Sequence, residues 1–290
     1  MVLQTPYDGS SRLFTVGLKV LDPAEWIDVD DNLRQHLDEK DRLANTVPDR
    51  IFAAEAGSEA AQAEVLHMLA DALPARFPHI YQRLGPVIEI VPAFRRVRLD
   101  DPFPPLLIAG GLVQEDLVLM RKGPGGWYLS AAHLSFPSSW RLHEKFLKPM
   151  HDIHAPVPGF SGSTRNADLI ERMFDNLRPD TPVIRWNWSL HADDALYHPE
   201  SPPQWRFGDR VEPWFRVERQ TLRKLPQSGA IVFTIRIYID PLAALESHAG
   251  AAGIAAALAQ QLADLTPEQA EYKGLTAERE RLIARLRAIG

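Results

Sequence analysis

The chain contains no cysteine. This absence excludes disulfides, thiol nucleophiles, thiolate-ligated haem, covalent c-type haem attachment and iron–sulfur clusters held by the chain's own thiolates. Any redox chemistry by this protein would therefore depend on a bound cofactor that needs no thiolate.

An excess of positive charge is also missing, because 32 Lys and Arg face 38 Asp and Glu, for a net charge of -6. This balance argues against nucleic acid as a partner. No apolar run reaches the roughly 18 residues of a membrane span, and the first residues do not resemble a signal peptide. We therefore expect a soluble, cytoplasmic protein with no membrane partner.

Glycine-rich cofactor motifs are absent as well. The sequence has no dinucleotide-binding glycine fingerprint, and the glycines at 123–126 lack the lysine and hydroxyl residue of a phosphate loop. We interpret 121–126 as a hairpin turn. A flavin or nicotinamide, if needed, would therefore come from another protein.

What is present is an ordinary core: 45% of the 290 residues are hydrophobic. We expect a mainly helical segment over 1–84, a core over 85–240 and packing helices over 241–290. Ser58 is a plausible N-cap for a helix with apolar residues at a period near 3.6, and prolines at 74, 78 and 86 should end that pattern.

Two groups of strand-like runs follow. The first is VIEIV, FRRVRL, LVLM and WYLSA between 87 and 131, and the second is 183–190, 214–222 and 230–239, with an antiparallel turn at 226–229. Helical signals lie between the groups, at 138–148 and roughly 164–177. This order predicts an α+β fold: a PAS-like antiparallel sheet with a helical excursion, flanked by N-terminal and C-terminal helices.

The C-terminal fifty residues carry helix boundary signals. Asp240 and Pro241 are a suitable N-cap and first residue for an alanine-rich helix. Thr266 to Gln269 matches a capping box, and Gly274 is a suitable C-cap before a last amphipathic helix.

Three of the ten histidines gather in the helical excursion, within FPSSWRLHEKFLKPMHDIHAPVPGF at 136–160. They are His143, on a helix expected to end at Lys148-Pro149, and His151 and His154, three residues apart. An imidazole can ligate a metal with one nitrogen while an acceptor orients the other. This segment is the strongest candidate for a metal or haem site.

Several segments resemble the haem-dependent oxidative N-demethylase family, typified by the haem-carrying subunit of dimethylamine demethylases. They are QEDL (114–117), the 136–159 segment, RWNWSL (185–190), 216–242 and YKGL (272–275). The resemblance implies a PAS-like core and a non-covalent b-type haem held by a histidine. His154, in IHAPVPG, matches the family's wording and is the expected iron ligand; His143 and His151 compete with it, and all three could instead be structural.

The remaining cofactor contacts are assigned by residue type. Haem propionates favour arginine, so Arg141, Arg219 and Arg236 are candidates, although arginines in central strands usually pair with a carboxylate. Trp140 could form a wall and Asn187 a polar contact, or both could serve packing. Strand alternation places Glu218 and Arg219 on opposite faces, and it places Phe233, Ile235 and Ile237 opposite Arg236.

For activity, the resemblance implies oxidation of a small methylated secondary or tertiary amine to formaldehyde and the shorter amine. A carboxylate in an aromatic cavity would suit the cationic substrate, and Glu115, Asp116 and Glu218 are the acids within the matching segments. Electrons would pass to a redox partner protein that carries flavin, an iron–sulfur cluster or both. Two alternatives stay open: a non-catalytic haem-binding sensor or carrier, and a protein whose histidines bind zinc or nothing.

Overall fold

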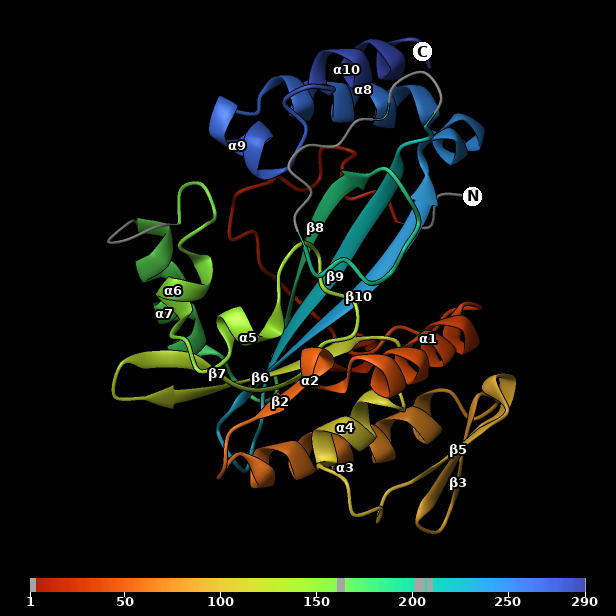
Figure 1. Ribbon diagram of the computed structural model, residues 1–290, viewed down its shortest axis with the longest axis vertical. Coiled ribbons are helices and arrows are strands. Elements are labelled where there is room, and N and C mark those ends of the chain that lie inside the picture. Colours follow the sequence, from red (N-terminus) through yellow and green to blue (C-terminus); the bar gives the residue numbers. More distant parts are fainter. Residues whose placement is uncertain (1–3, 161–164, 201–206, 208–210, 290) are drawn as a thin grey trace.

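The computed structural model describes residues 4–160, 165–200, 207 and 211–289 (Figure 1). Its main element is a seven-stranded antiparallel sheet in the order β1-β8-β9-β10-β6-β7-β2. The strands are β1 (Lys19–Val20), β2 (Phe52–Ala54), β6 (Asp116–Gly123), β7 (Gly126–His133), β8 (Val183–His191), β9 (Trp214–Lys224) and β10 (Ile231–Pro241).

The connectivity is the one expected from the sequence. β6 and β7 form a hairpin, helices follow, and β8, β9 and β10 form an antiparallel meander whose last strand pairs with β6. The predicted α+β class is confirmed. β1 and β2 come from the first 84 residues and extend the same sheet, and the division into three units remains a prediction.

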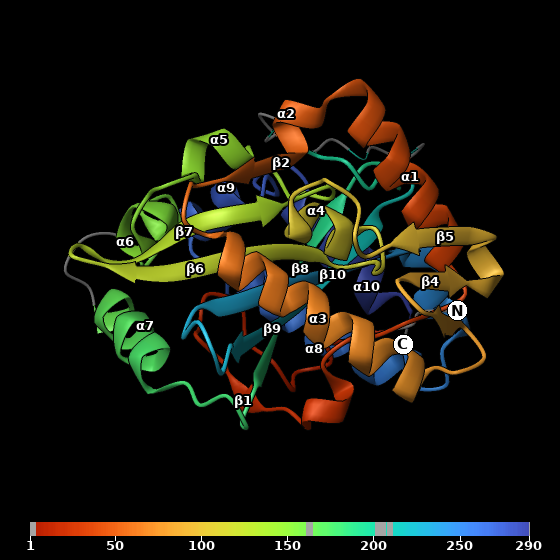
Figure 2. The same ribbon diagram turned by 90° about the horizontal axis from the view of Figure 1, so that it is seen from below.

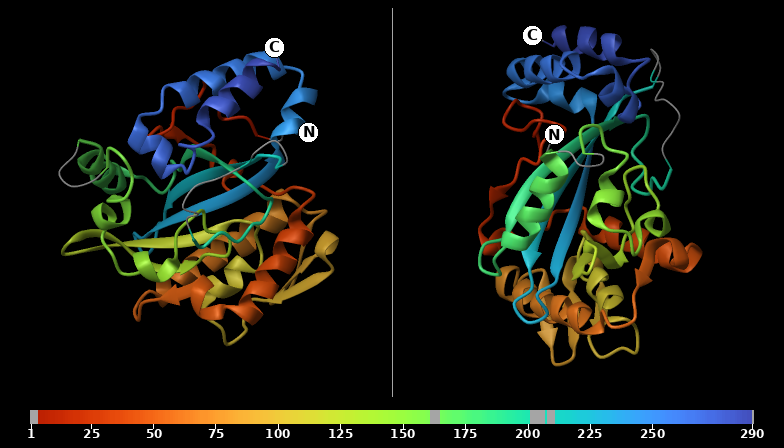
Figure 3. Two further views of the ribbon diagram at one scale, coloured as in Figure 1. Left: turned by 45° about the horizontal axis from the view of Figure 1, so that its top comes forward. Right: turned by 90° about the vertical axis from the view of Figure 1, so that its left-hand side faces the viewer.

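Helices cover both faces and one end of the sheet (Figures 1 and 2). One face carries α1 (Leu33–Thr46), α2 (Pro48–Ile51), α3 (Glu59–Arg76) and α4 (Pro105–Gly110), with a small sheet of β3 (Tyr81–Leu84), β4 (Val87–Ile90) and β5 (Arg95–Arg98). The opposite face, near the β6–β7 hairpin, carries α5 (Leu142–Lys145), α6 (Met150–His154) and α7 (Arg165–Asn176). The far end carries α8 (Ala251–Ala263), α9 (Pro267–Tyr272) and α10 (Arg279–Arg287), near both chain termini (Figure 3). Three 3-10 turns complete the elements: η1 (Pro23–Glu25), η2 (Val91–Ala93) and η3 (Leu242–Ser247).

The two faces of the sheet divide the core. Leu117 and Leu119 of β6 pack into the cluster with α1, α3 and α4, whereas Val118 and Met120 pack into the cluster with α5–α7. Successive strand residues point to opposite faces, so a single strand contributes to two separate cores. This alternation decides which polar side chains can meet.

Three local expectations are wrong. The helix expected to reach Lys148 is the four-residue α5, because Leu147 has φ 61° and its N–H bonds to the Leu129 carbonyl on β7 at 2.9 Å. Pro74 does not end α3, which runs to Arg76. Asp240 and Pro241 belong to β10 and are followed by η3, and the alanine-rich α8 begins only after Gly250.

Other expectations are confirmed. Thr266 and Gln269 form a reciprocal capping box on α9, and Gly274 takes φ 68° just beyond the helix, where glycine is favoured. The helix expected at 164–177 is α7, with Ile170 and Phe174 buried; residue 164 lies outside the described residues. Within the described part of the chain, no helix has the length and apolar content needed to cross a bilayer.

Candidate functional site

A cavity lies between the α5–α7 face of the sheet and those three helices. Its volume is about 240 Å³ when only the space that a water molecule can enter is counted. It is about 1430 Å³ when all empty space is counted, including the part open to bulk solvent. Strands β6 to β10 form its floor, and the N-terminal segment 14–18 and the end of α9 close one side. Its aromatic walls are Phe14, Phe136, Trp140, Phe160, Phe174 and Phe233.

His154, the last residue of α6, lines this cavity. Its Nδ1 lies 3.0 Å from the Met150 carbonyl one helical turn earlier. A carbonyl only accepts, so Nδ1 carries the hydrogen and Nε2 keeps its lone pair. Burial lowers the pKa of His154 to about 4, so the imidazole is neutral near pH 7. A neutral, oriented ring with one nitrogen available is what an iron ligand requires.

The other two histidines of the segment lie elsewhere. His151 is exposed and forms an ion pair with Asp152, with 3.1 Å between Nε2 and Oδ1. His143 is exposed and lines a separate cavity of about 140 Å³ next to Arg50 and Arg141. Trp140 lies between the two cavities and lines both. Of the three histidines, only His154 faces the larger cavity.

The arginines expected to face a cofactor do not line this cavity. Arg141 pairs with Glu200 on the surface. Arg219 donates to the Trp26 and Glu25 carbonyls, and Arg236 pairs with Asp30 on the α1 face of the sheet. All three have structural partners outside the cavity.

Three other cations line the cavity: Arg185, Lys145 and Lys273. Arg185 on β8 donates through Nη2 to the Thr15 carbonyl at 3.2 Å, and its Nε is buried without a hydrogen-bond partner among the described residues. Burial lowers the pKa of Lys145 to about 8, against the opposing charge of Glu218, and its Nζ lies 4.4 Å from the Trp140 ring centroid. Lys273 donates to Asn187 Oδ1 at 3.1 Å and to the Trp188 carbonyl at 2.7 Å.

Glu218 on β9 is a buried carboxylate at the cavity wall. Its Oε2 accepts from Asn187 Nδ2 at 3.2 Å and from Gln220 Nε2 at 2.6 Å, and the Ser138 hydroxyl also bonds to the carboxylate. Burial alone would raise the pKa of Glu218, but the Ser138 and Asn187 bonds and the charges of Arg216 and Lys273 lower it on balance. The carboxylate is therefore ionised near pH 7 and is held by neutral donors.

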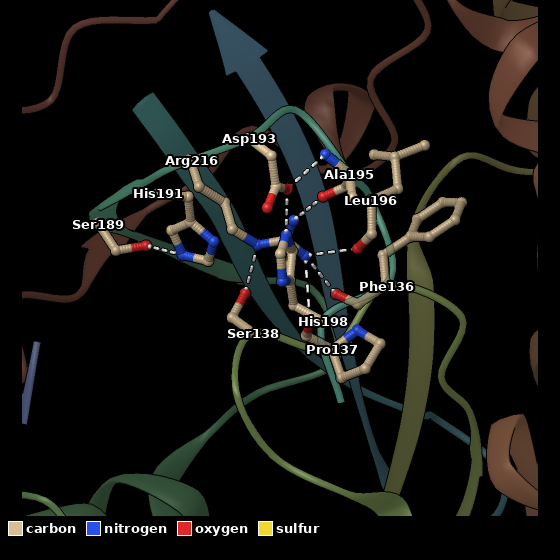
Figure 4. A network of polar contacts seen from close by, with 10 residues as sticks. All are labelled: Phe136, Pro137, Ser138, Ser189, His191, Asp193, Ala195, Leu196, His198 and Arg216. Carbon is tan, nitrogen blue, oxygen red and sulfur yellow. Dashed lines mark hydrogen bonds and ion pairs between the residues drawn. The ribbon is translucent and has the colours of Figure 1, made fainter. Parts of the chain in front are cut away.

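Arg216 holds Ser138, one of the Glu218 donors, in place (Figure 4). Its Nε donates to Ser138 Oγ at 2.8 Å, and its two Nη atoms donate to four carbonyls, at Phe136, Pro137, Ala195 and Leu196. Since a guanidinium only donates, Ser138 must accept from it, and the Ser138 hydrogen is left to point at Glu218.

The other two expected acids lie away from the cavity. Glu115 accepts from the Asp28 N–H at 3.0 Å. Asp116 accepts from the N–H groups of Ser135 and Phe136, at 2.7 and 2.9 Å. These bonds fix the chain on either side of the sheet core, and neither carboxylate faces open space.

Haem fits the residues present. The cavity combines apolar and aromatic walls, one neutral imidazole with an available nitrogen, and an arginine with an orphaned N–H. Haem iron needs only one protein ligand. Among the described residues, no three His, Asp or Glu side chains are arranged to hold a metal ion by themselves. The donor set therefore suits a porphyrin better than a bare metal ion.

Sequence reasoning missed Arg185, Lys145, Lys273 and Gln220. Arg185 and Lys273 are in the RWNWSL and YKGL segments, and period-2 alternation does place Gln220 on the same face as Glu218, although it was not named as a site residue. No local signal indicates that Lys273 reaches Asn187, 86 residues earlier.

A family model supports this reading independently. The model for the haem-dependent oxidative N-demethylase, alpha subunit-like, family matches residues 17–283. The match covers all the strands of the sheet and the cavity-lining residues named above, except those of the segment before residue 17. The chain therefore belongs to the haem-dependent oxidative N-demethylase alpha subunit-like family.

Proposed function

We propose that this chain is the haem-carrying subunit of an oxidative demethylase. It would hold a b-type haem non-covalently in the cavity and oxidise a small methylated secondary or tertiary amine. The strand order β7-β6-β10-β9-β8 with helices between the two strand groups supports a PAS-like core for this site. The single observation that carries the proposal is that an oriented neutral imidazole and an ionised buried carboxylate line one cavity.

His154 would ligate the iron through Nε2, with Nδ1 held by the Met150 carbonyl. Arg185 would pair with a propionate, because its Nε is buried at the cavity without a partner and guanidinium suits carboxylates. When bound, haem supplies the centre that accepts electrons from the C–H bond beside nitrogen. The overall change converts an N-methyl amine and water into the shorter amine and formaldehyde, with two electrons and two protons released.

Glu218 would bind the substrate's ammonium. Methylated amines are cationic near neutral pH, and a buried carboxylate held by neutral donors keeps its charge available to such a cation. Glu218 would also accept the ammonium proton, since the nitrogen lone pair must be free before the neighbouring carbon is oxidised. Lys145 is then a cation of the protein itself that competes with the substrate's ammonium for the Glu218 carboxylate.

The two electrons must leave the chain. Cysteine is absent and no dinucleotide fingerprint occurs, so a partner carrying flavin or an iron–sulfur cluster is part of the proposal. Membership in an alpha subunit-like family supports such a partner.

The iron ligand is tested by spectroscopy. His154→Ala should abolish or strongly change the Soret band of the haem-loaded protein. The matched controls are His143→Ala and His151→Ala, which alter exposed histidines of the same segment and should leave the band unchanged. Loss of the band in His143→Ala with an intact band in His154→Ala would refute the assignment.

Catalysis is tested separately from binding. Anaerobic addition of dimethylamine or trimethylamine to the ferric protein should reduce the haem and release formaldehyde in proportion. Binding of carbon monoxide or nitric oxide to the ferrous protein, with no reduction by any amine, would favour the sensor or carrier instead.

A further inference from the structure

Two buried cations approach Glu218 without touching it. Lys273 donates to Asn187 Oδ1, and Asn187 in turn donates from Nδ2 to Glu218. Arg216 donates to Ser138, whose hydroxyl bonds to Glu218. In both cases one neutral side chain stands between the positive charge and the carboxylate.

The direction of the first chain is fixed by chemistry. A lysine ammonium has donors only, so the Asn187 atom beside it must be the carbonyl oxygen. The amide hydrogens of Asn187 are then on the other side, toward Glu218. Asn187 and Glu218 are directly opposite each other in the β8–β9 pairing, so the amide has little room for another orientation.

Lys273 itself is held firmly. It is 9% exposed and also donates to the Trp188 carbonyl at 2.7 Å. It directly follows α9, so the C-terminal helices bring it to the sheet. Burying a lysine ammonium without a direct ion pair costs free energy of folding. A role in orienting Asn187 accounts for its position despite that cost.

We propose that Lys273 is a positioning residue for Glu218: through Asn187 it keeps an amide donor directed at the carboxylate and leaves that carboxylate's charge for a substrate cation. The inference deepens the proposed function and rests on it only for the identity of that cation. A direct Lys273–Glu218 ion pair would also keep the acid ionised but would use its charge within the fold, whereas the relay leaves the ionised carboxylate without a direct cation partner.

Other charged or titratable groups also face Glu218. They are Lys145 from α5, Arg185 from β8, Arg216 from β9 and Tyr272 from α9, and His154 from α6 lines the same cavity. A test must therefore separate orientation of Asn187 from simple loss of positive charge. A double-mutant cycle does so, because a residue that acts through Asn187 loses its effect when Asn187 is gone.

The readout is the protonation of Glu218 itself. Infrared difference spectra against Glu218→Gln report the carbonyl stretch of the protonated acid and need neither haem nor amine. Wild-type protein should show no such band at about pH 5, and Lys273→Met should raise the titration midpoint by about one pH unit, since the freed amide can turn its oxygen toward the carboxylate. In an Asn187→Ala background the same substitution should add no more than about a third of that shift.

Two further variants complete the design. Lys273→Gln removes the charge and keeps an amide donor for Asn187 Oδ1, so its midpoint should rise clearly less than that of Lys273→Met, by the loss of the charge alone; it also serves if Lys273→Met does not fold. Lys148→Met, which removes an exposed lysine, should have no effect. Equal shifts from Lys273→Met with and without Asn187, or equal shifts from Lys273→Met and Lys273→Gln, would refute the relay.

Amine binding is measured afterwards on haem-loaded protein, with dimethylammonium chloride as the probe and calorimetry as the readout. At a pH between the wild-type and variant midpoints, an amine affinity that falls as the infrared midpoint rises across the variants supports both proposals. A shifted infrared midpoint without any change in amine affinity would leave the relay standing and overturn the substrate role of Glu218.

Discussion

The two faces of the sheet bury charge in different ways. On the α1 face, Arg236 pairs directly with Asp30 at 2.7 Å and also contacts His36 Nδ1 at 3.0 Å. On the cavity face, Glu218 is held by neutral donors, and Lys273 and Arg216 each reach it through one neutral residue. The first arrangement neutralises charge within the fold, and the second leaves one carboxylate ready for a ligand.

This contrast explains why only one of the three acids proposed from the sequence is a binding candidate. Glu115 and Asp116 accept backbone N–H groups and connect segments that are distant in sequence, as Asp28 is from Glu115. Among the described residues, no backbone N–H donates to the Glu218 carboxylate, and Glu218 lines a cavity. Substitutions on the two faces should therefore separate into losses of stability and losses of binding.

The largest effect is expected on the α1 face. Arg236→Met would leave Asp30 without its ion-pair partner; because the Asp30 side chain is 22% exposed, the cost should lie at the lower end of that for a buried pair, about 3 kcal/mol. Urea unfolding of the haem-free protein should show this loss in the free energy of unfolding. Residual folded protein should still bind haem with an unchanged Soret band, because Arg236 does not line the cavity.

Next in size is the cavity carboxylate. Glu218→Gln keeps the shape but removes the charge, so dimethylammonium affinity should fall about a hundredfold, a change of about 2.7 kcal/mol. Calorimetry on the haem-loaded protein measures it. Glu115→Gln is the matched control, since it makes the same change outside the cavity and should leave amine affinity intact. Equal affinity losses in both variants would contradict the claim that only the carboxylate on the cavity face binds the amine.

The sequence predicts the parts of this contrast that depend on residues close together in the chain. Period-2 alternation predicted that Glu218 and Arg219 lie on opposite faces and that Phe233 and Ile235 lie opposite Arg236, and the structure agrees, because strand geometry is local. The histidine cluster was also visible, and the structure brings only His154 of the three to the cavity. The Lys273 contact joins segments 86 residues apart, and no local periodicity encodes such a distance.

The helix boundaries illustrate the same limit. The capping box at Thr266 depends on residues three apart and was predicted correctly. The end of α5 depends on Leu147 pairing with Leu129 of β7, a tertiary contact that overrides the helical pattern. Arg219 looked like a propionate ligand by type, yet its face of the strand meets the Trp26 and Glu25 carbonyls.

Asp116 offers a smaller test through pH. Burial raises its pKa from 3.8 to about 6, so the folded protein binds this proton more tightly than the unfolded chain does. The free energy of unfolding contributed by this group therefore falls as pH rises from about 4 to about 6, by on the order of 2–3 kcal/mol. Asp116→Asn cannot titrate, so the difference between wild type and variant should change across that window in urea denaturation. A pH-independent difference would contradict the raised pKa.

The smallest expected effect concerns the counter-charge of the cavity. Lys145→Met removes a cation that shares the cavity with Glu218, so dimethylammonium affinity near pH 7 should rise about threefold to tenfold, or roughly 1 kcal/mol. The pKa of Lys145 is about 8. Wild-type affinity should therefore rise as pH increases through 8, where Lys145 loses its charge, and approach that of the variant.

Lys148→Met is the control for this last change, because Lys148 is an exposed lysine three residues away and its removal alters the net charge equally. It should leave both the affinity and its pH profile unchanged. If Lys145→Met instead weakens amine binding, Lys145 holds the substrate rather than competing with it. The cavity face would then rely on paired charge just as the α1 face does.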